Sequence, residues 1–180
     1  MRKIVLTYGL IAGAILSVLM LATLPFLERI GFDRGAVIGY TTMVMAFLMI
    51  YFGVRSYRDN VLGGKIGFGR AFGTGVLITA VAAVCYVATW EFIQYKFMPD
   101  FADKYAAHEI DKARRDGATD AEIAAKSTEM AEFKEMYKNP LISVAFTFLE
   151  PLPVGLLFSL LSAAVHSRKR HSGLGAPARS

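Results

Sequence analysis

The chain has 180 residues, of which 54% are apolar, and a mean hydropathy of +0.42. Its apolar residues form several uninterrupted blocks of about 20 residues, which a soluble domain does not need because it buries one core behind amphipathic elements. Composition therefore excludes an ordinary soluble domain and predicts an all-α, polytopic membrane protein with four transmembrane helices. The single Cys85 lies in an apolar block, where a small buried hydrophobe is expected and no intramolecular disulfide is possible.

The first predicted span covers residues 4–27 and directly follows Arg2 and Lys3. Its apolar region exceeds the roughly 7–15 residues of a signal-peptide core, so we expect a retained helix with a cytoplasmic N-terminus. Three small residues recur every four positions on one face, where a neighbouring helix can approach closely: Gly9, Gly13 and Ser17. Packing within the chain is favoured over a dimer contact.

A short outer turn is expected after Pro25, where Gly31 and Gly35 stand among charged residues. The second predicted span, residues 36–54, runs back toward the cytoplasm. The inner connection, residues 55–70, contains the string GGKIGFG and several basic residues. It lacks the spacing of the known phosphate-binding fingerprints, so we expect a flexible cytoplasmic turn whose Lys and Arg side chains lie near anionic lipid.

The third predicted span covers residues 71–93 and carries a second packing face at four-residue intervals: Ala71, Gly75, Thr79 and Ala83. At a rise of about 1.5 Å per residue, Glu91 lies roughly 30 Å from Ala71, near the outer interface. Two interpretations stay open for Glu91. It is either a hydrated carboxylate at the helix mouth or one member of a path through the membrane.

Residues 97–139 form the only sizeable hydrophilic segment and predict an external amphipathic helical hairpin. Pro99 suits a first helical turn, Gly117 a C-terminal cap, and Thr119 with Glu122 a capping box. The second helix aligns its apolar residues on one face: Ile123, Met130, Phe133 and Tyr137. The hairpin could pack on itself, lie on the membrane surface, or bind a partner. His108 with Glu109 and Asp111 is too sparse for a metal site, so a solvated face is expected.

The fourth predicted span covers residues 141–165, opens at Pro140 and stops at the basic cluster of residues 168–170, with a disordered tail over 172–180. The flanks and loops on one side of these four spans hold ten Lys or Arg residues against Asp59 alone, and those on the other side hold ten against twelve Asp or Glu. Basic short loops remain cytoplasmic, so both termini are expected in the cytoplasm and residues 97–139 in the periplasm. The formal charge of +5 thus indicates orientation and not nucleic acid as a partner.

Glu150 stands about nine residues inside the fourth span, roughly 13 Å from its outer end and so near the membrane midplane. A charge there costs at least about 2.5–3.5 kcal/mol, so Glu150 should face the bundle, be protonated, or find a partner. Pro151 and Pro153 leave two carbonyl groups beside it without their helical donors. Close packing is expected just beyond, at Gly155.

Three stretches give the chain a resemblance to the bacterial domain-of-unknown-function family numbered 4199. These are Lys3–Leu6 with Tyr8–Gly13, Gly63–Gly69 followed by Ala71, Phe72 and Gly75, and Phe148–Pro153 with Gly155. The resemblance covers nearly the whole chain and implies a small four-helix membrane protein. It implies no activity.

Three hypotheses of function follow. In the first, the Glu150 carboxyl is neutral or paired and caps a kink that lets the fourth helix pack on the small-residue faces of the first and third. In the second, Glu150 and Glu91, with the helix broken at Pro151 and Pro153, form a proton or cation path in an oligomer. In the third, the protein is an accessory subunit in the bacterial inner membrane whose hairpin recognises itself or another membrane protein. Neither an enzyme, a cofactor nor a metal is expected, because the sequence pairs no nucleophile with a base and contains no cofactor fingerprint.

Overall fold

A computed structural model describes residues 1–167, apart from the side chain of Glu28. Its regular elements over these residues are all helices. They are α1 (Arg2–Thr23), the 3-10 turn η1 (Leu24–Phe26), α2 (Leu27–Asn60), α3 (Phe68–Phe97), α4 (Phe101–Arg115), α5 (Asp120–Tyr137), α6 (Pro140–Leu149) and α7 (Leu152–His166). Four stretches are long and apolar enough to cross a membrane: Arg2–Phe26, Arg29–Asn60, Phe68–Phe97 and Pro140–His166. The prediction of an all-α chain with four such helices is confirmed.

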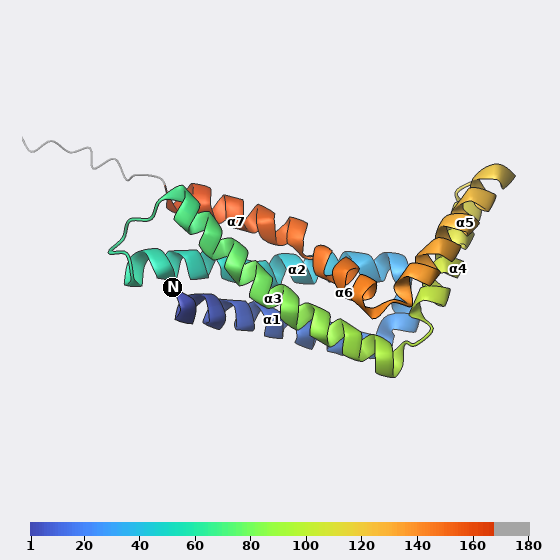
Figure 1. The fold of residues 1–180 in the computed structure, drawn as a ribbon, viewed down its shortest axis with the longest axis horizontal. Coiled ribbons are helices and arrows are strands. Elements are labelled where there is room, and N and C mark those ends of the chain that lie inside the picture. Colours follow the sequence, from blue (N-terminus) through green and yellow to red (C-terminus); the bar gives the residue numbers. More distant parts are fainter. Residues whose placement is uncertain (168–180) are drawn as a thin grey trace, which may run out of the picture.

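The four apolar helices lie side by side, with α6 and α7 in line as the fourth, and α4 and α5 project together from one end (Figure 1). We call this end the hairpin end, and the opposite end, with the connection over residues 61–67, the loop end. The central element is α3, which contacts both α1 and α7 along their lengths, while α2 covers the other side of both. The first hypothesis placed the fourth helix against the first and third. The contact with α3 is confirmed, but the other principal neighbour is α2 and not α1, because α1 lies on a different face of α3.

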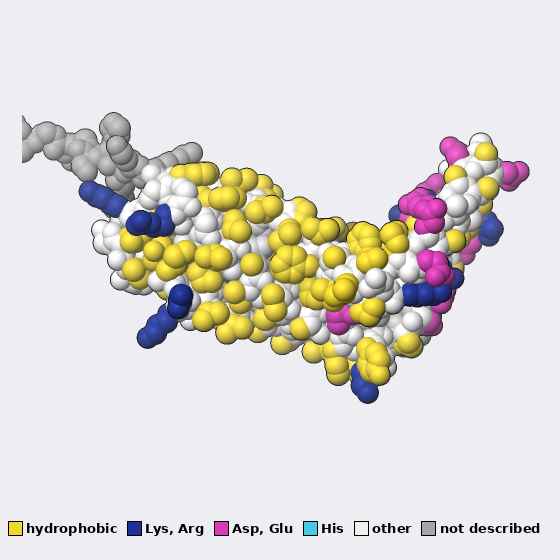
Figure 2. Space-filling model, in the orientation of Figure 1, with side chains coloured by type: hydrophobic (Ala, Val, Ile, Leu, Met, Phe, Trp, Pro, Cys, Tyr) yellow, Lys and Arg dark blue, Asp and Glu magenta, His cyan; other side chains and the backbone are white. Residues whose placement is uncertain are grey.

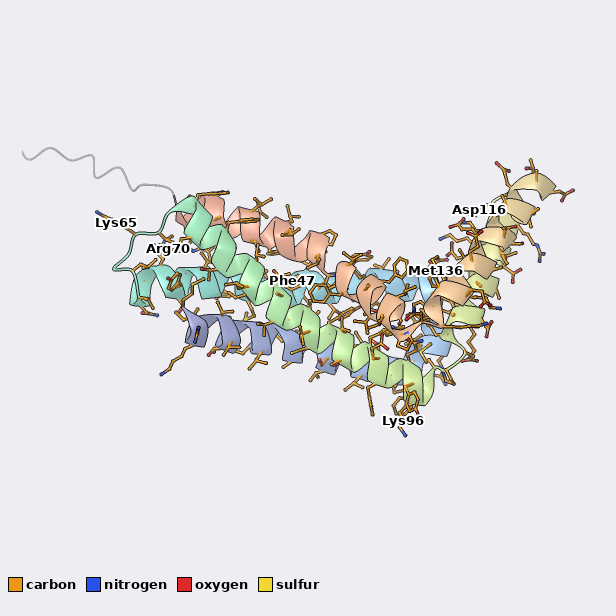
Figure 3. All side chains as sticks on the ribbon, viewed as in Figure 1. Phe47, Lys65, Arg70, Lys96, Asp116 and Met136 are labelled. Carbon is orange, nitrogen blue, oxygen red and sulfur yellow. The ribbon has the colours of Figure 1, made fainter. Side chains whose placement is uncertain are left out.

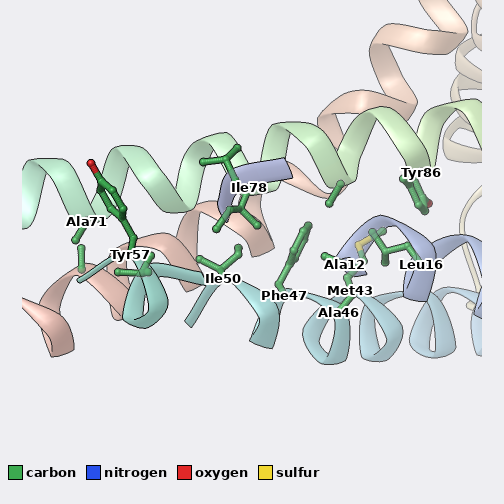
Figure 4. Packing of buried hydrophobic residues seen from close by; sticks show 14 of the residues in the cluster. Ala12, Leu16, Met43, Ala46, Phe47, Ile50, Tyr57, Ala71, Ile78 and Tyr86 are labelled. Atoms are coloured by element: carbon green, nitrogen blue, oxygen red, sulfur yellow. The ribbon is translucent and has the colours of Figure 1, made fainter. Parts of the chain in front are cut away.

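The buried core lies between α1, α2, α3 and α7. Phe47 and Ile50 of α2 meet Ile78 of α3 at its centre (Figure 4), and all three side chains are fully buried. Large apolar side chains are exposed on the outside of the same four helices, and the face of the bundle seen in Figure 2 is mostly apolar. Such a surface fits hydrocarbon as its solvent.

Two predicted connections are shorter than expected. The outer turn is helical from Leu27 onward and only bends at Gly31, whose φ of 73° and ψ of 169° are accessible almost exclusively to glycine. At the loop end, α2 continues to Asn60, and the chain reverses through Gly63 and Gly64, both with positive φ. Polar residues at both ends of α2 therefore extend the helix, since they need only solvent and not a loop to be satisfied.

The hairpin is closed by the expected local signals. The backbone N–H of Ala118 donates to the carbonyl of Ala113, and that of Gly117, at a φ of 83°, donates to Arg114. These two bonds make a Schellman cap. The capping box of Thr119 and Glu122 is present, and Pro140 stands in the first turn of α6. Pro99, in contrast, precedes α4 by two residues, because Asp100 is the N-cap.

Aromatic and charged contacts fix the base of the hairpin to the bundle. Phe32 of α2 packs against Phe101, Tyr105 and His108 of α4. Lys112 Nζ donates to Asp33 Oδ1 at 2.8 Å, and this hydrogen bond raises the pKa of Lys112. The interpretation of His108 as part of a solvated face was wrong, since its side chain is only 19% exposed and lies against Phe32. The predicted basic stop at 168–170 and the tail at 172–180 lie outside the described residues.

Candidate functional site

The fourth apolar helix is broken at the Glu-Pro-Leu-Pro segment, so α6 ends at Leu149 and α7 begins at Leu152. Pro151 has no N–H to donate to the carbonyl of Thr147, and Pro153 has none for Leu149. Helical hydrogen bonding resumes where the N–H of Gly155 donates to the carbonyl of Pro151 at 3.0 Å. Pro151 is buried and Pro153 is exposed, so only the first proline faces the bundle.

Glu150, the residue at this break, pairs with a phenol from α3. Tyr86 Oη donates a hydrogen bond to Glu150 Oε2 at 2.8 Å, and the Tyr86 side chain is only 9% exposed. Glu150 itself is exposed, because it faces an open cavity beside this bond. The carboxyl is thus paired but not enclosed.

A row of polar side chains continues from Glu150 toward the hairpin end. Ser143 and Thr147 stand seven and three residues before Glu150, on one face of α6, and both are buried. Ser143 Oγ donates to Glu91 Oε1 at 2.9 Å and lies 3.3 Å from Gln94 Oε1, while Thr147 Oγ1 donates to the carbonyl of Ser143. Glu91 is therefore a half-buried carboxylate that accepts a hydrogen bond from α6.

Beyond the break, toward the loop end, α7 closes tightly onto α3. A Cβ added to Gly75 would lie 2.7 Å from Ser159 Oγ and 2.8 Å from Ser159 Cβ, and one added to Gly155 would overlap Thr79. The two hydroxyl groups are satisfied within their own helices, where Thr79 donates to the carbonyl of Gly75 and Ser159 to that of Gly155. Ala83, on the same face of α3, is fully buried. Toward the loop end, the buried hydroxyl groups at this crossing are thus bonded within their own helices and tightly packed, and we call the crossing the closed floor below Glu150.

The other small-residue face, on α1, lies against the opposite side of α3. A Cβ on Gly9 would lie 2.6 Å from Val81 Cβ, and one on Gly13 would lie 2.6 Å from Cys85 Cβ. Ser17 Oγ is 2.7 Å from Thr89 Oγ1, so the third contact is a hydrogen bond. The partners on α3 are Val81, Cys85 and Thr89, which also recur every four residues. This is therefore a parallel crossing in which small residues of α1 meet successive turns of α3.

Two cavities open near the hairpin end. The first, which we call the central cavity, has a volume of about 460 Å³ and lies between α1, α2, α3, α6 and the hairpin; Glu150 and Tyr86 line it. The second, which we call the hairpin pocket, has a volume of about 440 Å³ and has charged residues on its walls, among them Glu91, Asp103 and Lys134. Tyr137 borders both and accepts a hydrogen bond from Trp90 Nε1 at 2.9 Å. Burial raises the pKa of Tyr137.

A family described as "Protein of unknown function (DUF4199)" matches residues 7–168. The chain belongs to this family. No curated protein and no solved structure matches it. The expected resemblance is confirmed, and the match includes every residue of the polar row and of both helix crossings.

Several residues of this DUF4199 site were missed by sequence reasoning. Tyr86, Ser143 and Thr147 lie within predicted spans, and none of their side chains was singled out. Ser143 and Thr147 stand seven and three residues before Glu150, and this spacing was a signal that one helix face is polar. Ser159, which meets Gly75, had no such signal, because only the contact between α3 and α7 gives it a role. Residues 1–167 contain no group of three His, Cys, Asp or Glu side chains that could hold a metal ion.

Proposed function

We propose that the protein is a non-enzymatic, structural or accessory component of the bacterial inner membrane. In this proposal the termini lie in the cytoplasm, the hairpin of α4 and α5 lies in the periplasm, and the four apolar helices anchor it. Charge supports the orientation, since Lys65 and Arg70 mark the loop end while the hairpin carries acids such as Asp116 (Figure 3). Figure 2 shows Asp and Glu side chains gathered on the hairpin.

Orientation can be tested with single cysteines in a Cys85→Ala background. A membrane-impermeant maleimide is expected to label Asp116→Cys in intact spheroplasts, and Lys65→Cys only after lysis. Labelling of Lys65→Cys in intact spheroplasts would show the opposite orientation.

The observation that carries the structural role is the closed floor below Glu150. A conducting path needs polar groups or water on both sides of the midplane, because unsolvated ions are costly there. Toward the loop end, however, Gly75 and Gly155 bring the backbones of α3 and α7 together. The buried polar side chains there each bond to a carbonyl group of their own helix: Thr74, Thr79, Ser159 and His166. Glu150 then serves to satisfy Tyr86 at the helix break, which fixes α6 against α3.

This role predicts that Glu150→Gln folds normally, because the amide oxygen of glutamine can still accept the hydrogen bond from Tyr86. Pro151→Ala should instead alter packing, since it restores an N–H at the break. Size-exclusion profiles and thermal unfolding in detergent measure both. Complete loss of a cellular phenotype in a stably inserted Glu150→Gln protein would contradict a purely structural role.

The accessory role assigns recognition to the hairpin. Met136 is 42% exposed there, whereas Met130 is 6% exposed in the same helix. A photo-crosslinking residue at position 136 is expected to capture another membrane protein, and the same residue at position 130 is its matched control. Capture of this chain alone would show that the hairpin contacts a second copy of the protein and not another membrane protein.

A second candidate is a proton or cation path in an oligomer. It is favoured by the polar side chains of Ser143 and Thr147, which stand on α6 between Glu91 and Glu150. Proteoliposome flux decides between the two: flux that is lost in Glu150→Ala supports the path, and flux that is absent from wild type, or unchanged in the variant, excludes it.

A further inference from the structure

The central cavity combines an apolar wall with a single charged group. Its lining comes from α1 to α6 and is mostly aliphatic and aromatic, with Trp90, Phe101, Tyr105 and Phe146 among the rings. About 460 Å³ is within the range of small-molecule sites, which are typically largely apolar with a few polar groups that orient the ligand. Its size and composition therefore suit one amphipathic molecule.

The polar groups that line the cavity favour a positively charged molecule. Among the described residues that line the central cavity, Glu150 is the only charged one, and none is Lys, Arg or His. Tyr86 donates only to Oε2 of the carboxyl, so Oε1 is not committed to that bond. Aromatic rings around a carboxylate favour a cation a second time, because the faces of Tyr and Trp attract ammonium groups.

We propose that the central cavity binds an amphipathic molecule whose cationic ammonium head group pairs with Glu150 while its apolar part lies along the aromatic and aliphatic walls. A neutral hydrocarbon tail from the bilayer is the competing occupant. Such a tail fills the same volume but leaves the exposed Glu150 oxygen without a partner in an apolar setting, which is costly. This inference needs no partner of the hairpin and no transport, so it stands or falls independently of the proposed function.

The cavity contains its own reporter, since Trp90 is the only tryptophan of the chain and lies on its wall. The probe is a bromine-tagged dodecyl trimethylammonium, whose bromine quenches indole fluorescence. The bromine-tagged dodecyl alcohol of equal chain length is the neutral control. Both are titrated into protein reconstituted in nanodiscs of a zwitterionic lipid, so that partitioning into lipid gives only a linear background.

Saturable quenching is expected with the ammonium probe and not with the alcohol. Glu150→Gln removes the carboxylate charge that attracts the quaternary ammonium group, so it should weaken the affinity at least about tenfold. Glu91→Gln is the matched control, because Glu91 lines the hairpin pocket and not the central cavity, and it should bind as wild type does. Tyr86→Phe keeps the carboxylate and should also retain saturable binding.

Two results overturn the proposal. Saturable quenching of equal strength by both probes, or by the ammonium probe in Glu150→Gln, identifies a hydrocarbon-tail site without charge selection. Quenching that stays linear in wild type shows that the cavity takes neither probe. Circular dichroism of each variant confirms that it is folded before it is scored.

Discussion

The closest helix crossing offers the sharpest test of how the bundle is held together. In Gly75→Ala, the new Cβ would lie 2.8 Å from Cβ and 3.0 Å from Cα of Ser159. Carbon atoms in ordinary contact stand about 3.5–4.0 Å apart, so α3 and α7 must separate locally by roughly 0.5–1 Å. The backbone Cα cannot rotate away, so a change of rotamer does not relieve the contact.

Overpacking of this kind costs about 1–3 kcal/mol. Replacing a helical glycine with alanine returns about 0.5–1 kcal/mol, so Gly75→Ala should lose up to about 2.5 kcal/mol relative to wild type and about 1–3 kcal/mol relative to a glycine replaced without overpacking. Reversible unfolding in mixed micelles with increasing SDS, followed by circular dichroism, measures this difference. Gly73→Ala is the matched control, because it lies on the same helix with nothing within 4 Å of its added Cβ, and it should be neutral or slightly stabilising.

A double variant separates the effect of the close contact between α3 and α7 from the effect of helix propensity. Adding Ser159→Gly to Gly75→Ala removes the contacts at 2.7 and 2.8 Å and leaves the one at 3.0 Å, so the two changes should couple favourably in a double-mutant cycle. If Gly75→Ala is as stable as Gly73→Ala, the close approach of α3 and α7 does not exist and the closed floor below Glu150 is lost with it.

Three further predictions concern the hairpin end. Gly31→Ala should destabilise the protein by about 1–3 kcal/mol because φ is positive there, whereas Gly35→Ala, with equally open surroundings, should be tolerated. Thermal unfolding compares the two variants, and equal stability would show that the chain does not bend at Gly31. Thr119→Ala should lower the free energy of unfolding by about 1 kcal/mol by removing the capping box, and it should speed hydrogen exchange at the start of α5. Thr128→Ala, in the middle of α5, should leave that exchange unchanged, and protection that survives Thr119→Ala would contradict the prediction. Because burial raises the pKa of Tyr137 above its ordinary value of 10.0, the folded state keeps the phenol proton more tightly than the unfolded state, so this contribution is complete below about pH 10 and falls as the pH rises further. Limited proteolysis between α4 and α5 should therefore accelerate at alkaline pH, less so in Tyr137→Phe, and an identical pH profile for both proteins would exclude Tyr137 as the cause.

Local signals in the sequence predicted those parts of the fold that depend on neighbouring residues. The capping box at Thr119, the cap at Gly117 and the first-turn Pro140 all appear as expected, because each needs only backbone groups within one or two turns. The bounds at the ends of α2 were less accurate. Polar residues there were read as turns, yet a helix can continue into water without cost to its backbone.

At the candidate site, too, local features could be predicted from the sequence and contacts between distant residues could not. Glu150 could be identified as costly from its apolar surroundings alone, but its partner Tyr86 lies 64 residues away in the chain and had no distinguishing pattern. The hydrogen bond that Ser143 donates to Glu91 likewise depends on how α6 lies over α3.

The sequence by itself determined the number of apolar helices, the helical caps and the presence of a carboxyl group beside two prolines in the last helix, because hydropathy and local hydrogen bonding act over short stretches of chain. Only the tertiary structure decided that this carboxyl bonds to Tyr86, that it faces a cavity on one side, and that α3 and α7 close beneath it. Those outcomes follow from which small-residue faces meet which helices, and that choice depends on contacts between residues far apart in the sequence.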